Sequence, residues 1–172
     1  MGICELLKNS GGHALLVGGC VRDMVIAREL PEFAYLRPKD FDLEVYGINL
    51  DKLEEILAGN YGDQNVRWEG SAFCVLKVSL PGIKDPVDLS TPRRDSKVSA
   101  DSFGHGRGFK ASGDPGMSVV EAAARRDLVF NTMAYDPMTE TLYDPYGGVE
   151  SIRKREIRVI NPESFKEDPL RV

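Results

Sequence analysis

Apolar residues along the chain follow first the period of a strand and then that of a helix, which predicts an α/β order of elements. Residues 14–17 are a short apolar run that ends at two glycines, typical of a buried strand. Residues 21–28 carry apolar side chains at helical spacing, and residues 41–46 alternate as a second strand. A strand, a glycine turn and a helix in this order are typical of a turn that binds phosphate at a helix N-terminus.

The rest of the chain predicts more helices and several short strands. Helices are expected at residues 5–9, 50–58, 119–126 and 146–154, and strands at residues 66–68, 72–80, 86–89 and 157–160. Residues 128–135 are a further apolar segment, and Pro81-Gly82 predicts a hairpin turn. Residues 96–116 are rich in glycine, serine and charge, so we expect a long functional or mobile loop. By strand alternation, Trp68 and Phe73 are expected in the core.

Length and composition indicate one domain, or one domain and a short extension, with a sizeable core, and the cysteines indicate a cytoplasmic protein. The chain has 172 residues, 42% of them hydrophobic, which is enough to bury a core. No apolar run approaches the roughly 20 residues of a membrane-spanning helix, and the first residues lack the basic and apolar regions of a secretory signal. Three scattered cysteines fit neither a disulfide framework nor a zinc site and are typical of reduced thiols.

The net charge of −5 differs from that of most nucleic-acid-binding domains, which are basic. Basic residues cluster only locally, at Arg93-Arg94, Arg125-Arg126 and Arg153-Lys154-Arg155. If the substrate is RNA, we therefore expect much of its binding surface to lie outside this chain.

The pattern that says most about chemistry is Asp40-Phe41-Asp42. On a strand, Asp40 and Asp42 project from the same face, where two carboxylates repel each other unless a cation neutralises them. Oxygen ligands of this kind suit Mg²⁺, which usually takes one or two carboxylates together with substrate phosphates. The glycine turn and Arg22 are suited to hold those phosphates. Together these residues predict metal-assisted transfer at a phosphate.

Seven motifs occur in the order found in a known family and span nearly the whole chain. They are Gly18-Gly19-x-Val21-Arg22-Asp23, Asp40-x-Asp42, Gly70-Ser71-Ala72-Phe73, and the blocks at residues 87–94, 125–131, 144–148 and 167–171. In these motifs the chain resembles the head (catalytic) domain of the class II tRNA nucleotidyltransferase and bacterial poly(A) polymerase family, within the DNA polymerase beta superfamily.

The resemblance implies an α/β (α+β) fold in which a small mixed or antiparallel sheet is backed by helices. It implies a head domain over residues 1–160 and the start of a helical neck over residues 161–172. The remaining neck, body and tail domains of the family, which help to select the base and hold the RNA, would lie outside this chain.

The resemblance also implies roles for individual residues. Asp40 and Asp42 would bind two Mg²⁺ ions, with Mn²⁺ as a substitute in vitro, and Asp88 would supply a third catalytic carboxylate. The residues implied in nucleotide binding are Gly18, Gly19, Arg22, Asp23, Arg125, Arg126, Asp127 and Asn131. The substrates would be CTP, ATP and an RNA 3′ end, above all that of a tRNA.

Simpler structural interpretations of some of these residues remain open. Asp23 lies in the first turn of a helix, where the helix dipole favours an acid. Asp88 fits an acid at a strand edge, while Arg125 and Arg126 fit solvated charges at a helix C-terminus. Asp144 is better explained as a turn former than as a catalytic acid.

Three functions are consistent with these motifs. The first is the head of an enzyme that adds CCA, or part of it, to tRNA. The second is a poly(A) polymerase, which uses the same chemistry, and the third is a non-catalytic nucleotide-binding module of the same fold. The three acids Asp40, Asp42 and Asp88 favour the catalytic functions, because a site without catalysis has little reason to keep them.

The chain departs from the family pattern at two places. Residues 128–132 read Leu-Val-Phe-Asn-Thr, where the family commonly has Phe-Thr-Ile-Asn-Ala, so a threonine hydroxyl is lost. Residues 29–38, between the predicted helix and Asp40, are longer than the usual tight connection. We expect them to form an added surface loop.

Overall fold

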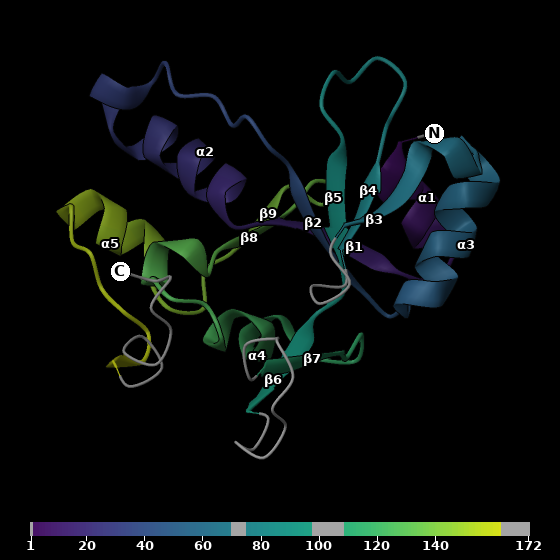
Figure 1. The fold of residues 1–172 in the computed structure, drawn as a ribbon. Helices are drawn as coiled ribbons and strands as arrows, with labels where there is room; N and C mark the ends of the chain where they lie inside the picture. Colours follow the sequence, from purple (N-terminus) through teal and green to yellow (C-terminus); the bar gives the residue numbers. More distant parts are fainter. Residues whose placement is uncertain (1, 70–74, 98–108, 163–172) are drawn as a thin grey trace. The chain divides into compact units, whose positions relative to one another are not determined.

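The computed structural model describes residues 2–69, 75–97 and 109–162 (Figure 1). The motifs at residues 70–73 and 167–171, and almost all of the expected start of a neck, lie outside these described residues. No helix in the described part of the chain is long and apolar enough to span a membrane.

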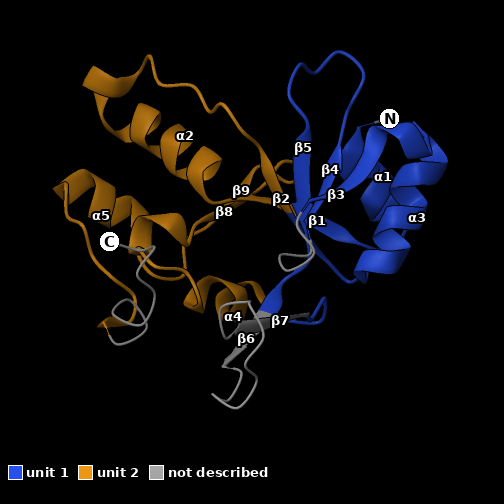
Figure 2. Ribbon diagram, viewed as in Figure 1, with its two compact units in different colours: residues 1–14, 44–117 blue, residues 15–43, 118–172 orange. Residues whose placement is uncertain are grey.

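The chain divides into two compact units (Figure 2). Unit 1 comprises Met1–Ala14 and Glu44–Met117, and unit 2 comprises Leu15–Leu43 and Ser118–Val172. Within the described residues, seven strands are hydrogen-bonded in the order β3-β4-β5-β2-β1-β8-β9. Strands β1 (His13–Val17) and β2 (Asp42–Tyr46) each have residues in both units.

Unit 1 carries an antiparallel set of three strands. These are β3 (Val66–Glu69), β4 (Val75–Val78) and β5 (Val87–Ser90). The register places Leu76 opposite Leu89 and Val78 opposite Val87, and all four side chains are buried. Because strand side chains alternate, this register leaves the polar residues of β4 and β5 on the other face. The turn expected at Pro81-Gly82 is present, with Gly82 at a φ of +79°.

Helix α3 (Leu50–Tyr61) contributes an apolar stripe to unit 1. It begins where the Asn49 side chain accepts a hydrogen bond of 2.9 Å from the Lys52 backbone N–H, which caps the first turn. Leu53 and Leu57 lie one turn apart and are fully buried, so this face of the helix packs into the core. The other helical elements of unit 1 are α1 (Ile3–Asn9) and the 3₁₀ turn η2 (Asp63–Asn65).

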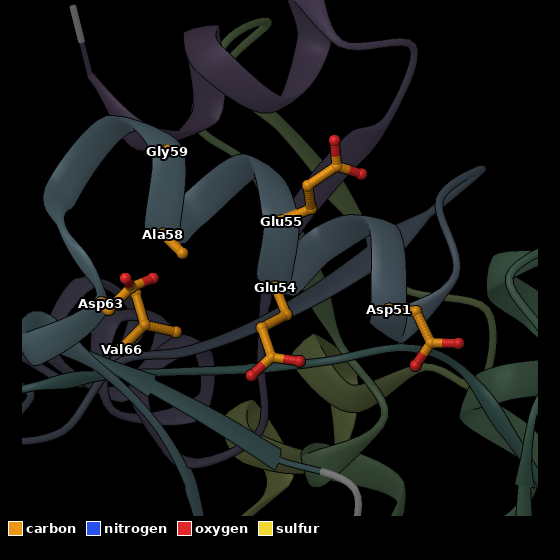
Figure 3. A pocket seen from close by; sticks show the side chains of 7 residues that line it. All are labelled: Asp51, Glu54, Glu55, Ala58, Gly59, Asp63 and Val66. Carbon is orange, nitrogen blue, oxygen red and sulfur yellow. The ribbon is translucent and has the colours of Figure 1, made fainter.

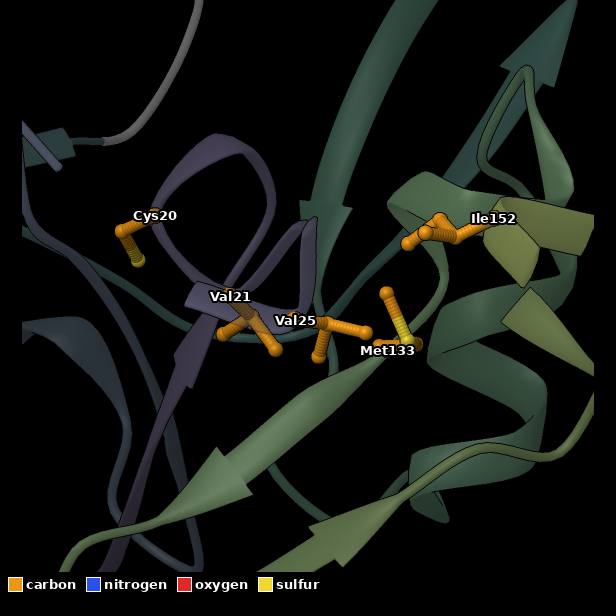
Figure 4. Close-up of a cluster of buried hydrophobic side chains, with 5 residues drawn as sticks. All are labelled: Cys20, Val21, Val25, Met133 and Ile152. Carbon is orange, nitrogen blue, oxygen red and sulfur yellow. The ribbon is translucent and has the colours of Figure 1, made fainter. Parts of the chain in front are cut away.

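Unit 2 is built from helices and a hairpin of short strands. Its elements are α2 (Gly19–Glu29), η1 (Pro31–Phe33), α4 (Val119–Ala124), η3 (Val129–Asn131), β8 (Ala134–Asp136), β9 (Thr141–Tyr143) and α5 (Gly148–Lys154). Cys20, Val21 and Val25 of α2 form a buried cluster with Met133 and Ile152 (Figure 4). This cluster fixes the beginning of α2 within unit 2, because its members come from three separate segments.

The prediction of a loop over residues 96–116 is wrong at both ends of this range. Strands β6 (Arg93–Lys97) and β7 (Phe109–Gly113) pair antiparallel as a separate two-stranded sheet. Residues 98–108, including most of the expected loop, lie outside the described residues. The ladder of a strand pair is formed by backbone hydrogen bonds, so polar and small residues can pair in this way without an alternating apolar pattern in the sequence.

Three smaller expectations also need correction. Trp68 is 44% exposed instead of buried, and its indole Nε1 donates a hydrogen bond of 2.7 Å to Glu54; Phe73 lies outside the described residues. The strand expected at residues 157–160 is only a single bridge between Leu128 and Val159. Strand β9 was not predicted, because three residues are too few to show alternation.

Ion pairs tie α5 to the C-terminal end of α2. The Arg153 Nε lies 2.7 Å from Glu29 Oε2, and Arg155 forms an ion pair with Glu32 of η1. Arg28 contacts the same Glu29 carboxylate at 2.8 Å. Arginines from the basic cluster at residues 153–155 therefore have structural partners within unit 2.

Glu29 makes the stability of this contact depend on acid pH. Hydrogen bonds from Arg153 and Arg28 lower the pKa of the Glu29 carboxyl from its ordinary value of 4.5. Because the folded-state pKa is the lower one, this stabilisation is present above about pH 4.5 and is lost as the pH falls through the folded-state pKa. We expect Glu29→Gln to show a smaller fall in melting temperature between pH 6 and pH 3 than the wild type. Thermal melts would measure it, with Glu140→Gln, an exposed glutamate, as the control; identical pH profiles of wild type and Glu29→Gln would contradict it.

Candidate functional site

The candidate site in unit 2 begins at the glycine turn between β1 and α2. Gly18 has a φ of +74° and a ψ of −137°, a conformation that is essentially restricted to glycine. A Cβ at Gly18 would lie 3.2 Å from Arg126 Nη1 and 3.5 Å from Asp42 Oδ2. The turn therefore brings together an arginine and an aspartate that are far apart in the sequence.

Arg22 lies over this turn, in the first part of α2. Its Nη2 is 3.6 Å from the position that a Cβ would take at Gly19. Its Nε and Nη2 both lie 2.8 Å from Asp23 Oδ1, and its side chain is 34% exposed. Because a guanidinium has five N–H donors, Arg22 keeps donors for an anion at the turn while Asp23 holds it in place.

A short hydrogen-bond network reaches Arg22 from η3. The Asp127 Oδ1 accepts hydrogen bonds from the Leu128 backbone N–H at 2.7 Å and from Asn131 Nδ2 at 3.1 Å. The Asn131 amide is thereby oriented so that its Oδ1 accepts from Arg22 Nη1, at a longer distance of 3.4 Å. Asp127 and Asn131 thus help to position Arg22; whether they also contact a nucleotide stays a prediction.

Asp40 and Asp42 lie at the entrance to β2. The strand begins at Asp42, which is half-buried, while Asp40 lies in the bend before it and is exposed. The Asp42 carboxylate beside the glycine turn, with the exposed Asp40 two residues before it in the chain, fits Mg²⁺, which completes its coordination with water and phosphate oxygens. The described residues contain no group of three or more acidic, histidine or cysteine side chains placed to hold a metal ion. The fit of Mg²⁺ therefore depends on Asp40 and Asp42 with ligands supplied by the substrate.

Cys20 lies near the Asp42 carboxylate but adds no charge to the site. It is 3% exposed, and its Sγ donates a hydrogen bond of 3.2 Å to the Val17 carbonyl. Burial raises the pKa of the Cys20 thiol, and the nearby Asp42 carboxylate also raises it. The thiol is therefore neutral at physiological pH and belongs to the core of unit 2.

The remaining predicted residues have structural partners or belong to the other unit. Asp88 lies on β5 in unit 1, where its Oδ1 is 3.3 Å from Lys77 Nζ; its role as a third catalytic carboxylate stays a prediction. Arg125 is the C-cap of α4. Asp144 accepts hydrogen bonds from the Gly148 and Val149 backbone N–H groups at 2.5 and 3.0 Å, as its interpretation as a turn former predicted.

The family model described as the poly(A) polymerase head domain matches residues 14–158 of the chain. The chain belongs to this family. The match covers the glycine turn, Asp40, Asp42 and the segment from Arg125 to Asn131, so the resemblance seen in the sequence is confirmed.

Relatives of this head domain support the same assignment. The multifunctional CCA protein of Stenotrophomonas maltophilia is 50% identical over 158 residues, which are 91% of this chain and 32% of that protein. The crystal structure of the Bacillus stearothermophilus CCA-adding enzyme in complex with CTP is 27% identical, with a TM-score of 0.68 over 99% of this chain and 35% of that chain. A tRNA nucleotidyltransferase complexed with a primer tRNA and an incoming ATP analog gives a TM-score of 0.66 at 26% identity, covering 99% of this chain and 42% of that chain.

These comparisons confirm the predicted α/β fold with a small sheet and helices. The chain spans about a third of the length of the curated relative from Stenotrophomonas.

A hollow in unit 1 of the head domain is unsuited to nucleotides. It has a volume of about 540 Å³ and lies beside α3 (Figure 3). Four carboxylates line it: Asp51, Glu54, Glu55 and Asp63. Because phosphates are negatively charged, this acidic lining would repel them, in contrast to the turn of unit 2 with its two arginines.

Proposed function

We propose that this head domain catalyses the transfer of a nucleotide from CTP or ATP to the 3′ end of an RNA, above all a tRNA. The observation that carries the proposal is the convergence of Asp42, Arg126 and Arg22 on the Gly18–Gly19 turn. This arrangement supplies an acidic group for a metal and cationic donors for phosphates within one unit.

The triphosphate would bind at the N-terminal end of α2. The first N–H groups of a helix lack intrahelical partners and attract anions, and α2 has eleven residues. Arg22 and Arg126 would add charge-assisted hydrogen bonds on either side of the turn. Asp23 and Asn131 would keep Arg22 in place before the nucleotide arrives, which lowers the entropic cost of binding.

The reaction would be an in-line displacement at the α-phosphate. The oxygen of the RNA 3′-hydroxyl forms a bond to the α-phosphorus while the bond to the β-phosphate oxygen breaks, and pyrophosphate leaves. The hydroxyl proton passes to water or to a carboxylate of the site. Asp40 and Asp42 would hold two Mg²⁺ ions, which polarise the attacking hydroxyl and neutralise the leaving group.

The relatives support tRNA as the RNA substrate, because one solved relative is a CCA-adding enzyme and another is complexed with a primer tRNA. The family description favours a second candidate, a poly(A) polymerase. Both functions use the same residues, so the primer and the nucleotide distinguish them.

An extension assay tests the proposed function. The purified chain is incubated with Mg²⁺, each NTP separately, and either a tRNA that lacks its 3′ CCA or an oligoadenylate primer. Addition of CMP or AMP to the tRNA supports the first function, and AMP addition to oligoadenylate alone supports the second. Absence of extension by both this chain and a C-terminally longer form would contradict both functions.

Arg22→Ala is expected to raise the KM for the NTP by about 10- to 100-fold, because hydrogen bonds to charged groups contribute roughly 1.5–3 kcal/mol. Steady-state kinetics at saturating RNA would measure it. Arg28→Ala is a matched control, because it removes an exposed arginine from the other end of α2. An unchanged KM in Arg22→Ala would show that Arg22 has only a structural role.

A further inference from the structure

The segment between α2 and β2 (residues 30–41) presents an exposed aromatic ring. Tyr35 is 73% exposed, and the segment is the one that the sequence identified as longer than usual. A tyrosine combines an apolar ring with a polar hydroxyl, which suits it to a binding surface that is partly wet. Residues 35, 37 and 39 are exposed while residues 36 and 38 are half-buried, so Tyr35, Arg37 and Lys39 project outward.

The segment is held by its own hydrogen bonds, so the ring of Tyr35 has a fixed support. The Leu36 backbone N–H donates to the Phe33 carbonyl at 2.9 Å, and Arg37 Nη1 donates to the carbonyls of Ala34 and Leu36 at 2.8 Å. The rings of Phe33 and Tyr35 are 6.4 Å apart at an interplanar angle of 45°. An aromatic side chain with such support binds at a low entropic cost.

Unit 2 also anchors the base of the segment. Glu32 of η1 forms an ion pair with Arg155, so this acid is engaged within unit 2. With Glu32 paired, Arg37 and Lys39 supply positive charge near Tyr35, and the exposed acid that follows them, Asp40, is a proposed metal ligand. A ring flanked by positive charges suits a nucleobase and its phosphates, because bases stack on aromatic faces and lysines attract the backbone.

The position of the segment indicates which part of the RNA would bind to it. It runs from the C-terminal end of α2 to the start of β2 (Figure 1). Asp42 is the first residue of β2 and Asp40 comes two residues before it, and these candidate metal ligands must meet an RNA 3′-hydroxyl. Asp40 is five positions after Tyr35, so their Cα atoms are at most about 18 Å apart. A strand whose last nucleotide lies at the metal site could therefore place one of the preceding bases on Tyr35.

We infer that residues 35–39 form a platform for the single-stranded 3′ end of the RNA, on which Tyr35 stacks a base and Lys39 contacts a phosphate. Arg37 holds the turn through its bonds to Ala34 and Leu36. The inference rests on the proposed function, and it assigns part of the primer to this unit of the head domain.

Two measurements test the platform with the chain intact. The first is the Kd of a short, 5′-fluorescein-labelled single-stranded RNA with a free 3′-hydroxyl, measured by anisotropy without NTP. Tyr35→Ala is expected to weaken binding by roughly tenfold or more, whereas Tyr35→Phe keeps the ring and stays within about twofold of the wild type. In a plot of the logarithm of the binding constant against the logarithm of the salt concentration, Lys39→Ala is expected to make the slope shallower by about 0.7, because one phosphate contact is lost. Met138→Ala, which truncates an exposed apolar side chain elsewhere in unit 2, serves as the control.

The second measurement is extension kinetics, in which Tyr35→Ala is expected to raise the KM for RNA while the KM for the NTP is unchanged. Wild-type affinity for RNA in Tyr35→Ala, or equal losses in Tyr35→Ala and Tyr35→Phe, would overturn the stacking role. A loss of NTP affinity equal to that for RNA would also overturn it. If the wild type extends RNA and the variants match it, the inference fails and the proposed function stands. If neither the wild-type chain nor its C-terminally longer form binds or extends RNA, the proposed function fails as well.

Discussion

Asp42→Asn is expected to lower the rate of nucleotide addition by on the order of 10²–10³-fold, the range seen when one electrostatic contact to a transition state is removed. The substitution keeps the shape of the side chain but removes its charge, so the attraction for Mg²⁺ is lost. Because Asp42 Oδ2 faces the glycine turn, the loss falls where the phosphates would bind. Asp40→Asn is expected to act in the same direction, and single-turnover extension at fixed Mg²⁺ would measure both rates.

The control for this prediction is Asp51→Asn, which removes an exposed acid from the hollow of unit 1. Its rate is expected to equal that of the wild type, and its melting temperature to fall only slightly, because Asp51 lies in the first turn of α3, where the helix dipole favours an acid. A second readout is the dependence on Mg²⁺, since a weakened metal site requires a higher concentration for half-maximal rate. Wild-type rates in both Asp40→Asn and Asp42→Asn would show that these carboxylates are not metal ligands.

The sequence predicted the local part of this site well. The apolar run before Gly18 and the helical spacing after it correctly placed the turn between β1 and α2. The alternation around Asp42 correctly predicted β2, although the strand begins one residue later than expected. These features depend on neighbours in the sequence, so periodicity and turn chemistry are sufficient to find them.

The contacts across the site were beyond prediction from local patterns. The approach of Arg126 to Gly18, and the link from Asn131 to Arg22, join segments that are distant in the sequence. Such contacts arise only when the core cluster around Val25 and Met133 packs α2 against the rest of unit 2. The family resemblance implied that these residues form a nucleotide site. The structure adds the contacts between some of them, such as the hydrogen bond from Arg22 to Asn131.

Residues and strands at the edges of sheets account for most of the remaining differences between the sequence predictions and the structure. Trp68 alternates like a core residue, but β3 lies at the end of the strand order and leaves the indole exposed. The hairpin of β6 and β7 consists largely of polar and small residues, and its ladder is made by backbone groups that show no signature in the side-chain pattern. The basic residues Arg153 and Arg155 resemble a binding patch in the sequence but form ion pairs in unit 2.

Gly18→Ala is expected to lower nucleotide addition by roughly 10²-fold and to reduce stability by about 1–3 kcal/mol. The stability loss follows from the backbone, because an alanine is strained at a φ of +74° and a ψ of −137°. The activity loss follows from the surroundings, because the new Cβ would lie 3.2 Å from Arg126 Nη1 and 3.5 Å from Asp42 Oδ2. To relieve this crowding, the arginine or the turn must move, and the groups that would meet the phosphates lose their arrangement.

Gly82→Ala separates these two effects. Gly82 also has a positive φ, of +79°, but among the described residues other than its chain neighbours, no heavy atom lies within 4 Å of the position that a Cβ would take there. This control is expected to lose stability through backbone strain while keeping its rate of nucleotide addition. Denaturant unfolding and extension kinetics on both variants would measure the two quantities. Equal activity losses in Gly18→Ala and Gly82→Ala would mean that strain alone lowers activity, and full activity in Gly18→Ala would contradict a phosphate site at this turn.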